Sequence, residues 1–129
     1  MPDADESAEI RSVIQAYIDS IKHNTPDRMP EIFHPAASMS RHGGDGRFLV
    51  TTNPGADIQR YMKSVPPTLE TSPNFDGEIV EVNQVGNMAS GWIREHNLEG
   101  LNFNTFFHLH KVDGTWVITA KATRGAPAG

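Results

Sequence analysis

Apolar and polar residues alternate with a period close to two along the last quarter of the chain, residues 101–124, LNFNTFFHLHKVDGTWVITAKATR. Successive side chains of a β-strand point to opposite faces of a sheet, so this period predicts strands. Asp113 and Gly114 divide the stretch, and an Asp-Gly pair favours a type I′ turn, in which both residues have positive φ. We therefore expect a hairpin of two long strands with Val112 opposite Thr115.

The register of this predicted hairpin gives the sheet two different faces. One face is almost wholly apolar and is expected to carry Phe103, Phe107, Leu109, Trp116, Ile118 and Ala120. The other mixes imidazole, hydroxyl and amine groups and is expected to carry Asn104, Phe106, His108, His110, Val117, Thr119, Lys121 and Thr123. We take the mixed face as the candidate binding surface.

Two earlier strands are predicted at residues 77–85, rich in Ile and Val, and 88–96, with a turn at Gly86-Asn87 between them. Residues 98–100 are expected to form a three-residue hairpin loop, with Gly100 in the left-handed conformation. Pairing Asn97 with Leu101 would then add four side chains to the mixed face: Ser90, Trp92, Arg94 and His96. Glu95 should point to the opposite face.

The first half of the chain has helical periodicity instead. Residues 3–23 carry an apolar stripe at helical spacing, formed by Ile10, Val13, Ile14, Tyr17, Ile18 and Ile21. Asp3 and Glu6 have the spacing of a capping box, and Asp5 or Ser7 could equally cap the helix. We expect this helix to end at Asn24.

Two shorter helices are predicted to follow. One begins at Thr25-Pro26 and ends near His34, because the residue before Pro35 avoids the α region. It should bury Met29, Ile32 and Phe33. The other begins at Asn53-Pro54 and ends before Pro66, with Ile58, Tyr61 and Met62 as its apolar stripe. Residues 37–52 should be extended around a glycine-rich loop at 43–46, and residues 68–75 should form a loop.

Helices followed by a strand meander are typical of the α+β class, with the helices gathered on one face of an antiparallel sheet. The 129 residues fit a single domain, residues 1–129. With a formal net charge of −5 and scattered Lys and Arg, we expect no nucleic-acid partner. An acidic start, no long apolar run and no Cys predict a cytoplasmic protein without a signal peptide or membrane span.

The segments IQAYIDSIKHNTPDRMPEIFHPAASM and FFHLHKVDGTWVITAK resemble the nuclear-transport-factor-2-like superfamily. Within it the sequence is most similar to the putative lumazine-binding branch, near the polyketide-cyclase-like (SnoaL-like) and ketosteroid-isomerase-like groups. The resemblance covers essentially the whole chain. It implies a cone-shaped fold, in which three N-terminal helices pack on a strongly curved antiparallel sheet, with a pocket between its concave face and the helices. It also implies sheet-to-sheet homodimers.

The isomerases of this superfamily suggest roles for three residues of the chain. Tyr17 matches their tyrosine that donates to a developing enolate, and His108 matches a protonated aspartate of the same oxyanion hole. Their catalytic base, an aspartate, is replaced here by Arg41. An arginine stays protonated and cannot abstract a proton, so this sequence does not support isomerase chemistry by that route.

Other residues also have more than one interpretation. Tyr17 is either a core aromatic residue or a ligand-facing hydroxyl, and His34 could simply interact with helix-end carbonyls. His108 and His110 have a metal-ligand spacing, yet no third ligand is placed to join them, so we expect no metal and no cofactor. Trp92 is either a core residue or a lid over a ring-shaped ligand.

Three basic residues could create an anion-binding pocket: Arg41, Arg94 and Lys121. Lys121 could instead extend past Phe106 to water. We therefore predict a small-molecule-binding protein of unknown ligand, without catalysis, whose ligand contacts Trp92, Arg94, Arg41, Phe106, Lys121 and His34. The alternative is an isomerase, cyclase or dehydratase acting on a cyclic or carbonyl substrate through His108 and Tyr17. A third possibility is a pure dimerisation module.

The apolar face predicts the assembly. If the helices cover the mixed face, the apolar face is left exposed, and monomers rarely expose so large an apolar patch. We therefore expect a homodimer that buries this face, with Trp116 or Phe107 as anchors.

Overall fold

The structure is a computed structural model that describes residues 4–128. Its elements in chain order are α1 (Ser7–His23), the 3₁₀ helix η1 (Pro26–Arg28), α2 (Met29–Ile32), β1 (Phe33–His42), β2 (Phe48–Thr52), α3 (Pro54–Ser64), α4 (Thr68–Thr71), β3 (Asp76–Val85), β4 (Met88–Leu98), β5 (Leu101–Val112) and β6 (Thr115–Pro127). The strands form one six-stranded sheet in the order β2-β1-β6-β5-β4-β3. Among the described strands, β1 and β6 run parallel and every other neighbouring pair runs antiparallel.

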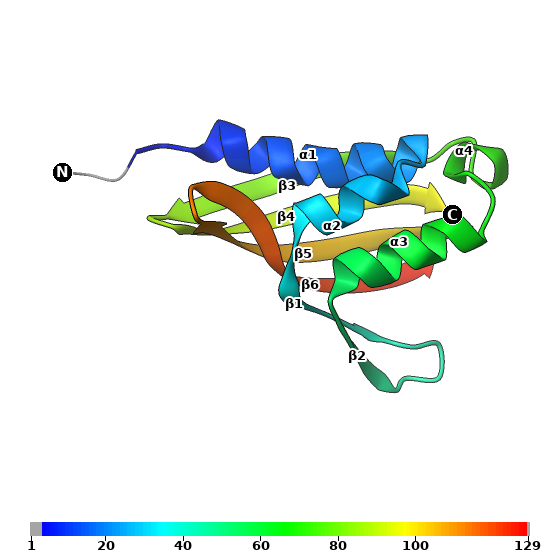
Figure 1. Cartoon of the computed structure of the whole chain (residues 1–129). Coiled ribbons are helices and arrows are strands. Elements are labelled where there is room, and N and C mark those ends of the chain that lie inside the picture. The colour runs from blue at the N-terminus through cyan, green and yellow to red at the C-terminus, as the bar shows by residue number, and fades with distance from the viewer. Residues whose placement is uncertain (1–3, 129) are drawn as a thin grey trace.

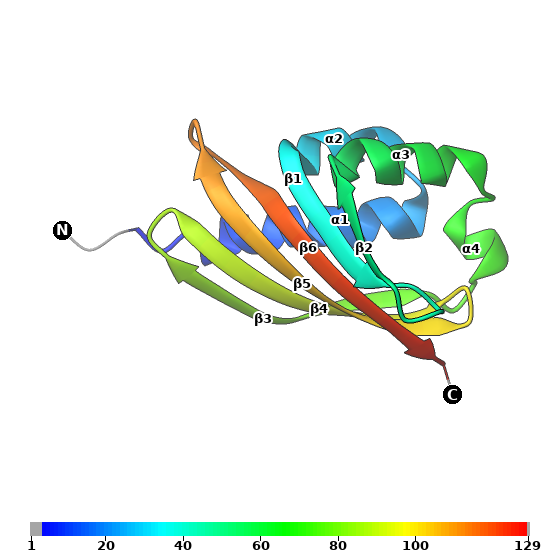
Figure 2. The same ribbon diagram turned by 90° about the horizontal axis from the view of Figure 1, so that it is seen from below.

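The helices lie together on one side of the sheet (Figure 1). The sheet curves toward them, so that β1 and β2 rise beside α3 while β3 and β4 run under α1 (Figure 2). This arrangement confirms the predicted α+β fold with helices on a curved sheet. None of the described helices has the length and apolar character that a membrane span requires.

Helix α1 follows its predicted stripe. Ile10, Ile14, Tyr17 and Ile18 are buried, and the helix ends at Asn24, whose left-handed backbone directs its N–H to the carbonyl of Ser20. The described helix begins at Ser7, and the expected cap residue Asp3 lies outside the described residues. Asp5 accepts hydrogen bonds from the backbone N–H and the hydroxyl of Ser7.

The other helices correct the sequence predictions in detail. The second predicted helix is divided into η1 and α2 and stops at Ile32, so His34 lies in a strand and not at a helix end. Residues 68–71, expected in a loop, form the short helix α4. Helix α3 begins at Pro54 as predicted and buries Ile58 and Met62, while Tyr61 remains half exposed.

Two glycines let α1 approach the sheet closely. A Cβ on Gly77 would lie 2.6 Å from Cγ2 of Ile18, and one on Gly91 would lie 2.4 Å from Cδ1 of Ile14. Real Cβ atoms do not approach other heavy atoms so closely, so a side chain at Gly77 would push against the stiff Ile18, whereas at Gly91 the terminal methyl of Ile14 would have to rotate away. Gly77 in β3 therefore allows the close approach of α1 to the sheet.

The hairpin turns are close to those predicted. Asp113 and Gly114 have φ of 50° and 82°, and Val112 pairs with Thr115, which confirms the type I′ prediction. Between β4 and β5, Leu98 pairs with Leu101, so the turn has two residues and not three. The extra residue is absorbed before the turn, where the ladder shifts between Glu95 and Leu98.

A bulge in β6 changes which residues share a face. Leu109 pairs with Ile118 but His108 pairs with Ala120, so Thr119 is an extra residue in β6. A bulge of one residue reverses the facing of everything beyond it. Lys121 therefore pairs with Phe107, and Thr123 with Thr105. The prediction that Lys121 and Thr123 share a face with His108 was wrong for this reason.

The apolar face of the sheet is the one that the helices cover. Phe107, Leu109 and Ile118 are 0% exposed and belong to one core with Ile10 and Ile14 of α1. The expectation that the mixed face lies under the helices was therefore wrong. The stripe of α1 needs an apolar surface to pack on, and this face of the sheet carries Phe107, Leu109 and Ile118. The same burial removes the predicted homodimer through the apolar face, including Trp116 and Phe107 as its anchors.

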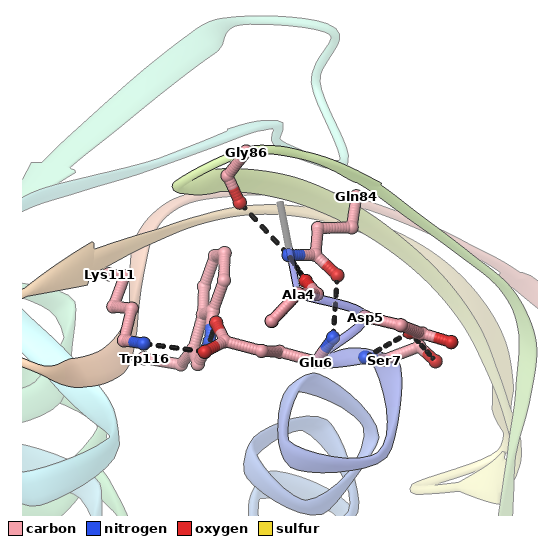
Figure 3. Close-up of polar contacts among 8 residues, drawn as sticks. All are labelled: Ala4, Asp5, Glu6, Ser7, Gln84, Gly86, Lys111 and Trp116. Atoms are coloured by element: carbon pink, nitrogen blue, oxygen red, sulfur yellow. Dashed lines mark hydrogen bonds and ion pairs between the residues drawn. The ribbon is translucent and has the colours of Figure 1, made fainter. Parts of the chain in front are cut away.

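The N-terminal end of α1 is fixed to both long hairpins by polar contacts (Figure 3). The Glu6 carboxylate accepts hydrogen bonds from Nζ of Lys111 at 2.5 Å and from Nε1 of Trp116 at 2.7 Å. The Glu6 backbone N–H donates to Oε1 of Gln84 at 2.8 Å. Residues of β3, β5 and β6 thus converge on one residue before the helix.

The hydrogen bonds from Lys111 and Trp116 to the Glu6 carboxylate predict that the stability of the fold depends on pH. Hydrogen bonds from Lys111 and Trp116 hold the pKa of Glu6 below its ordinary value of 4.5. Its ionised form therefore stabilises the fold fully above pH 4.5, and this contribution is lost as the pH falls through the folded-state pKa. We expect Glu6→Gln to lower the urea midpoint at pH 7, with a smaller difference from wild type in acid. Glu31 is exposed and supplies a control. If Glu31→Gln lowers the urea midpoint as much as Glu6→Gln does, the hydrogen bonds to the Glu6 carboxylate do not stabilise the fold as proposed.

Candidate functional site

Five polar side chains lie on the helix-facing side of the sheet, among the apolar core. We call them the inner cluster: Tyr17 from α1, Glu95 from β4, Thr105 from β5, and Lys121 and Thr123 from β6. Glu95 comes from the same side of β4 as Ile93, and the bulge in β6 brings Lys121 to this side. The helix-facing side of the sheet therefore holds three titratable side chains, Tyr17, Glu95 and Lys121.

Tyr17 and Lys121 form the central contact of the inner cluster. Nζ of Lys121 donates a hydrogen bond to the Tyr17 hydroxyl at 2.6 Å and lies 5.0 Å from the centre of the tyrosine ring. The ring is 3% exposed and packs edge-on against Phe33 and Phe107. Because the Tyr17 oxygen is the acceptor of this bond, its own proton is free to be donated to another group.

Glu95 is the least compensated residue of the inner cluster. It is 3% exposed, and its Oε2 atom has no hydrogen-bond partner among the described residues. Burial raises the pKa of the Glu95 carboxyl, while the charge of Lys121 acts in the opposite direction. A buried carboxyl oxygen without a partner is unfavourable, and native structures contain few of them.

The charges of the inner cluster influence one another. Burial lowers the pKa of Lys121, the charge of Glu95 raises it, and that of Arg41 lowers it further. Burial, with the negative charge of Glu95, also raises the pKa of Tyr17 well above its ordinary value. At neutral pH the Tyr17 hydroxyl therefore stays protonated and can donate a hydrogen bond.

Arg41 and the two threonines of the cluster, Thr105 and Thr123, lie on the neighbouring strands β1, β5 and β6. Arg41 pairs with Thr123 across β1 and β6, and its side chain is exposed. The hydroxyls of Thr105 and Thr123 lie 2.8 Å apart. The cluster thus continues from a buried carboxyl to an exposed guanidinium.

Two hollows lie at the ends of the elements that carry the inner cluster; Thr123 lines one of them, and the other four residues of the cluster line neither. One, of about 170 Å³, lies between the C-terminal end of α1, α3, α4 and the β4–β5 turn, and Phe103 is part of its lining. The other, of about 380 Å³, lies beside the β1–β2 hairpin and is lined by His42, Gly43, Thr123, Arg124 and Gly125. Phe103 pairs with Glu95, and its ring covers Gly125, so this one side chain stands between the two hollows.

Four of the eight site residues predicted from the sequence lie on the outer face, away from the helices: Trp92, Arg94, Phe106 and His108. The Cζ atom of Arg94 lies 4.9 Å from the centre of the Trp92 ring. The ring centres of Trp92 and Phe106 lie 5.8 Å apart. His108 pairs with Ser90 and is exposed. Trp92, Phe106 and His108 line a shallow hollow of about 180 Å³. The prediction that these residues share a face is confirmed, but that face is not covered by helices.

The structure separates the two residues that the enzyme interpretation combined. Tyr17 lies in the core under the sheet, whereas His108 lies on the outer face. They cannot contact one substrate in this fold, which corrects their pairing as acid–base and electrophilic partners. His34 is also occupied locally, since its Nδ1 accepts a hydrogen bond from the N–H of Ala36.

The histidines do not gather into a metal site. His110 Nδ1 lies 2.9 Å from the hydroxyl of Thr119, and His96 lies 3.3 Å from Glu78. Within residues 4–128 there is no group of three or more His, Cys, Asp or Glu placed to hold a metal ion.

Sequence reasoning missed Glu95 and Thr105 as site residues. Both lie on the apolar side of their strands, where the alternating pattern leads one to expect Ile, Leu or Phe. A charged residue at an apolar position is the signal that could have identified Glu95. Lys121 was found, but on the wrong face, because nothing in the alternation of β6 marks the bulge at Thr119.

Comparisons with known proteins agree with this architecture. Residues 5–123 match the family described as putative lumazine-binding. An NTF2-like protein of unknown function from Shewanella baltica OS155 is 26% identical, with a TM-score of 0.82 and 95% of each chain covered. One from Methylobacillus flagellatus KT is 24% identical, with a TM-score of 0.81 over 96% of this chain and 94% of the other.

The fold is also shared by a de novo designed protein with a curved β-sheet, at 14% identity, a TM-score of 0.62, and 91% and 100% coverage. A search of curated proteins found no match. The family match spans most of the chain and agrees with the cone of helices on a curved sheet. The chain therefore belongs to the putative lumazine-binding family of the nuclear-transport-factor-2-like superfamily.

Proposed function

We propose that this protein binds a small organic molecule on the helix-facing side of its sheet, at the inner cluster. The single observation that supports this most strongly is the buried Oε2 atom of Glu95, which has no partner within residues 4–128. A ligand that donates a hydrogen bond to this atom would remove the unfavourable burial. Ligand sites of proteins are typically apolar hollows with a few such polar groups.

The surroundings of the cluster support a small ligand. The hollow beside Phe103 has a volume of about 170 Å³, below the range of about 300 to 1,000 Å³ typical of drug-sized ligands. Its lining is mainly apolar, with Ile58, Met62 and Val65 from α3 and the residue after it. Glu95 and Lys121 do not line this hollow, so an occupant of one or two rings would reach them only if Phe103, the strand partner of Glu95, moves aside.

Binding to the inner cluster can be tested with lumazine, the molecule in the family's description, and with other planar bicyclic heterocycles. Equilibrium dialysis should detect binding to the wild-type protein. The double variant Glu95→Leu, Lys121→Met should lose it, because both polar contacts are removed together. His108→Ala should retain it, since His108 lies on the outer face. If no compound in such a panel binds, or if only His108→Ala abolishes binding, the proposed site is wrong.

We also propose that two copies of the chain pair through the outer face of the sheet. This face carries several exposed apolar side chains: Val85 (67% exposed), Phe106 (57%), Met88 (49%) and Val80 (37%). Monomeric proteins rarely leave such side chains grouped on one surface, and two-fold pairing is the commonest way to cover them. The dimer replaces the one expected through the opposite, buried face.

Light scattering should give twice the chain mass of 14.2 kDa for the wild-type protein at micromolar concentration. Phe106→Arg should shift the mass to that of one chain, because it places a charge at the centre of an interface of about 1,200 to 2,000 Å². Phe48→Arg, at an exposed position on the edge strand β2, serves as the matched control and should remain dimeric. A wild-type protein with the mass of one chain would contradict this pairing.

A further inference from the structure

The charged side chains of the outer face are divided between its strands. Paired residues of neighbouring strands point to the same side of a sheet, so the register identifies the residues that share the outer face with Trp92 and Arg94. On β3 these are Glu78, which pairs with Arg94, and Glu81, which pairs with Trp92. On β6 it is Arg124, which is level with Arg94 because both pair with the same residue of β5. The outer face is therefore acidic along β3 and basic at β6, three strands away.

These charges are only partly neutralised within one chain. Glu78, Glu81 and Arg124 are all exposed. The Glu78 carboxylate lies 3.3 Å from His96, and that of Glu81 accepts a hydrogen bond from the amide of Asn83 at 3.3 Å. Within residues 4–128, Arg124 forms no ion pair. One chain thus carries an arginine and a pair of carboxylates that are too far apart to meet each other.

Apolar side chains lie between the acidic and the basic strand. Trp92 of β4 pairs with Phe106 of β5, which pairs with Ala122 of β6. Phe106 and Ala122 are both exposed. Protein interfaces typically have an apolar centre and a polar rim. The outer face has this arrangement, and the two sides of its rim carry opposite charges.

The position of the charges distinguishes two ways of stacking two copies through this face. A two-fold axis in the plane between the sheets can run along the strands or across them. An axis along the strands, between β4 and β5, places β3 of one copy over β6 of the other. An axis across the strands places β3 over β3 and so brings the acids together. Charges of opposite sign fix the register of an interface, and like charges disfavour the wrong one.

We propose that two copies pair about a two-fold axis that runs along the strands, between β4 and β5, so that Arg124 of each copy faces Glu78 and Glu81 of the other. This inference rests on the proposed pairing through the outer face. At the axis, Trp92 of one copy packs on Phe106 of its partner. Symmetry repeats each contact, so the charges act twice in every dimer. The apolar centre supplies affinity, and the charges determine the orientation.

Arg94 fixes the position of this axis. With the axis between β4 and β5, Arg94 lies over β5 of the partner, at the level of the neutral Asn104. With the axis on β5, β4 would lie over β6, and Arg94 would meet Arg124. Two arginines that face each other across an interface are unfavourable, so the first position is the one that the charges select.

Charge reversal tests the orientation, with dimer dissociation constants measured by sedimentation equilibrium at low salt. Arg124→Glu should raise the constant about tenfold or more, because it places acid against acid on both sides of the interface. The double variant Glu78→Lys, Glu81→Lys should raise it similarly. The triple variant that combines them should return to within about threefold of wild type, since opposite charges face each other again. Arg11→Glu, exposed on α1, is the matched control and should leave the constant unchanged.

The chain has no Cys, so single cysteines give a second measurement. A short bismaleimide should join the Glu81→Cys and Arg124→Cys proteins when they are mixed, and should join neither protein to itself. Cross-linking of Glu81→Cys to itself, without cross-linking of the mixture, would show an axis across the strands and overturn the inference.

These measurements separate the orientation from the pairing on which it rests. Recovery of the dimer in the triple variant supports the orientation, because substitutions that merely disrupt the surface would add their effects. If wild type is a dimer that Phe106→Arg dissociates, but the triple variant is as weak as the reversals that it combines, the orientation is wrong and the pairing stands. If wild type has the mass of one chain, both fail.

Discussion

Phe107→Ala should destabilise the protein by about 3 to 5 kcal/mol, the range for removing a buried aromatic ring. Phe107 is 0% exposed and packs against Tyr17, whose ring centre lies 5.1 Å away. Its loss would leave a cavity in the middle of the core, between the sheet and α1. Urea unfolding monitored by circular dichroism gives the difference in free energy of unfolding.

The matched control for Phe107 is Phe48→Ala. Phe48 is 63% exposed on the edge strand β2, so the same truncation there should cost less than about 1 kcal/mol. This pair of variants tests which residues the helices cover. Similar losses of stability at the two positions would contradict the assignment of Phe107 to the core.

Gly77→Ala should destabilise the protein by about 1 to 3 kcal/mol, although alanine is not a worse strand residue than glycine. The new Cβ would meet Cγ2 of Ile18 at 2.6 Å, with Cγ1 and Cβ of the same side chain at 3.3 and 3.5 Å. Ile18 is β-branched and stiff, so α1 has to shift away from the sheet. The change is measured by the same urea unfolding.

Gly44→Ala is the control for this prediction, because nothing lies within 4 Å of a Cβ added at that position. It should change the free energy of unfolding by less than about 0.5 kcal/mol. In an Ile18→Ala background, the effect of Gly77→Ala should become much smaller, since the colliding atoms are gone. An undiminished effect in that background would mean that the close approach of α1 is not its cause.

The sequence predicted the elements of this fold well because local patterns determine them. The Asp113-Gly114 turn, the end of α1 at Asn24 and the start of α3 at Pro54 all follow from the preferences of the residues at those positions. The grouping of Trp92 and Phe106 on one face follows from the period of two, even though the turn between their strands was misjudged.

The choice of covered face could not be read from the period of two. Alternation shows that Leu109 and His108 point in opposite directions, but only packing decides which of the two meets α1. The apolar stripe of α1 decides which face is covered, because Ile10 and Ile14 are shielded from water by packing against Leu109 and its neighbours. The resemblance to a pocket-forming superfamily favoured the opposite answer, because the polar side chains of the mixed face looked like the wall of a pocket.

The candidate site was the least predictable part. It depends on the bulge at Thr119, which moves Lys121 from the face of His108 to the face of Phe107. A bulge of this kind leaves no mark in a run such as Trp-Val-Ile-Thr-Ala-Lys. Glu95 was placed on the correct side of β4, yet its importance appears only when burial and the missing partner of Oε2 are known.

The most direct test of this account is a crystal structure of the protein with lumazine bound. The account predicts ligand density on the helix-facing side of the sheet, beside Phe103, with a ligand donor within hydrogen-bonding distance of Oε2 of Glu95. Density confined to the outer face, against Trp92 and His108, would contradict it.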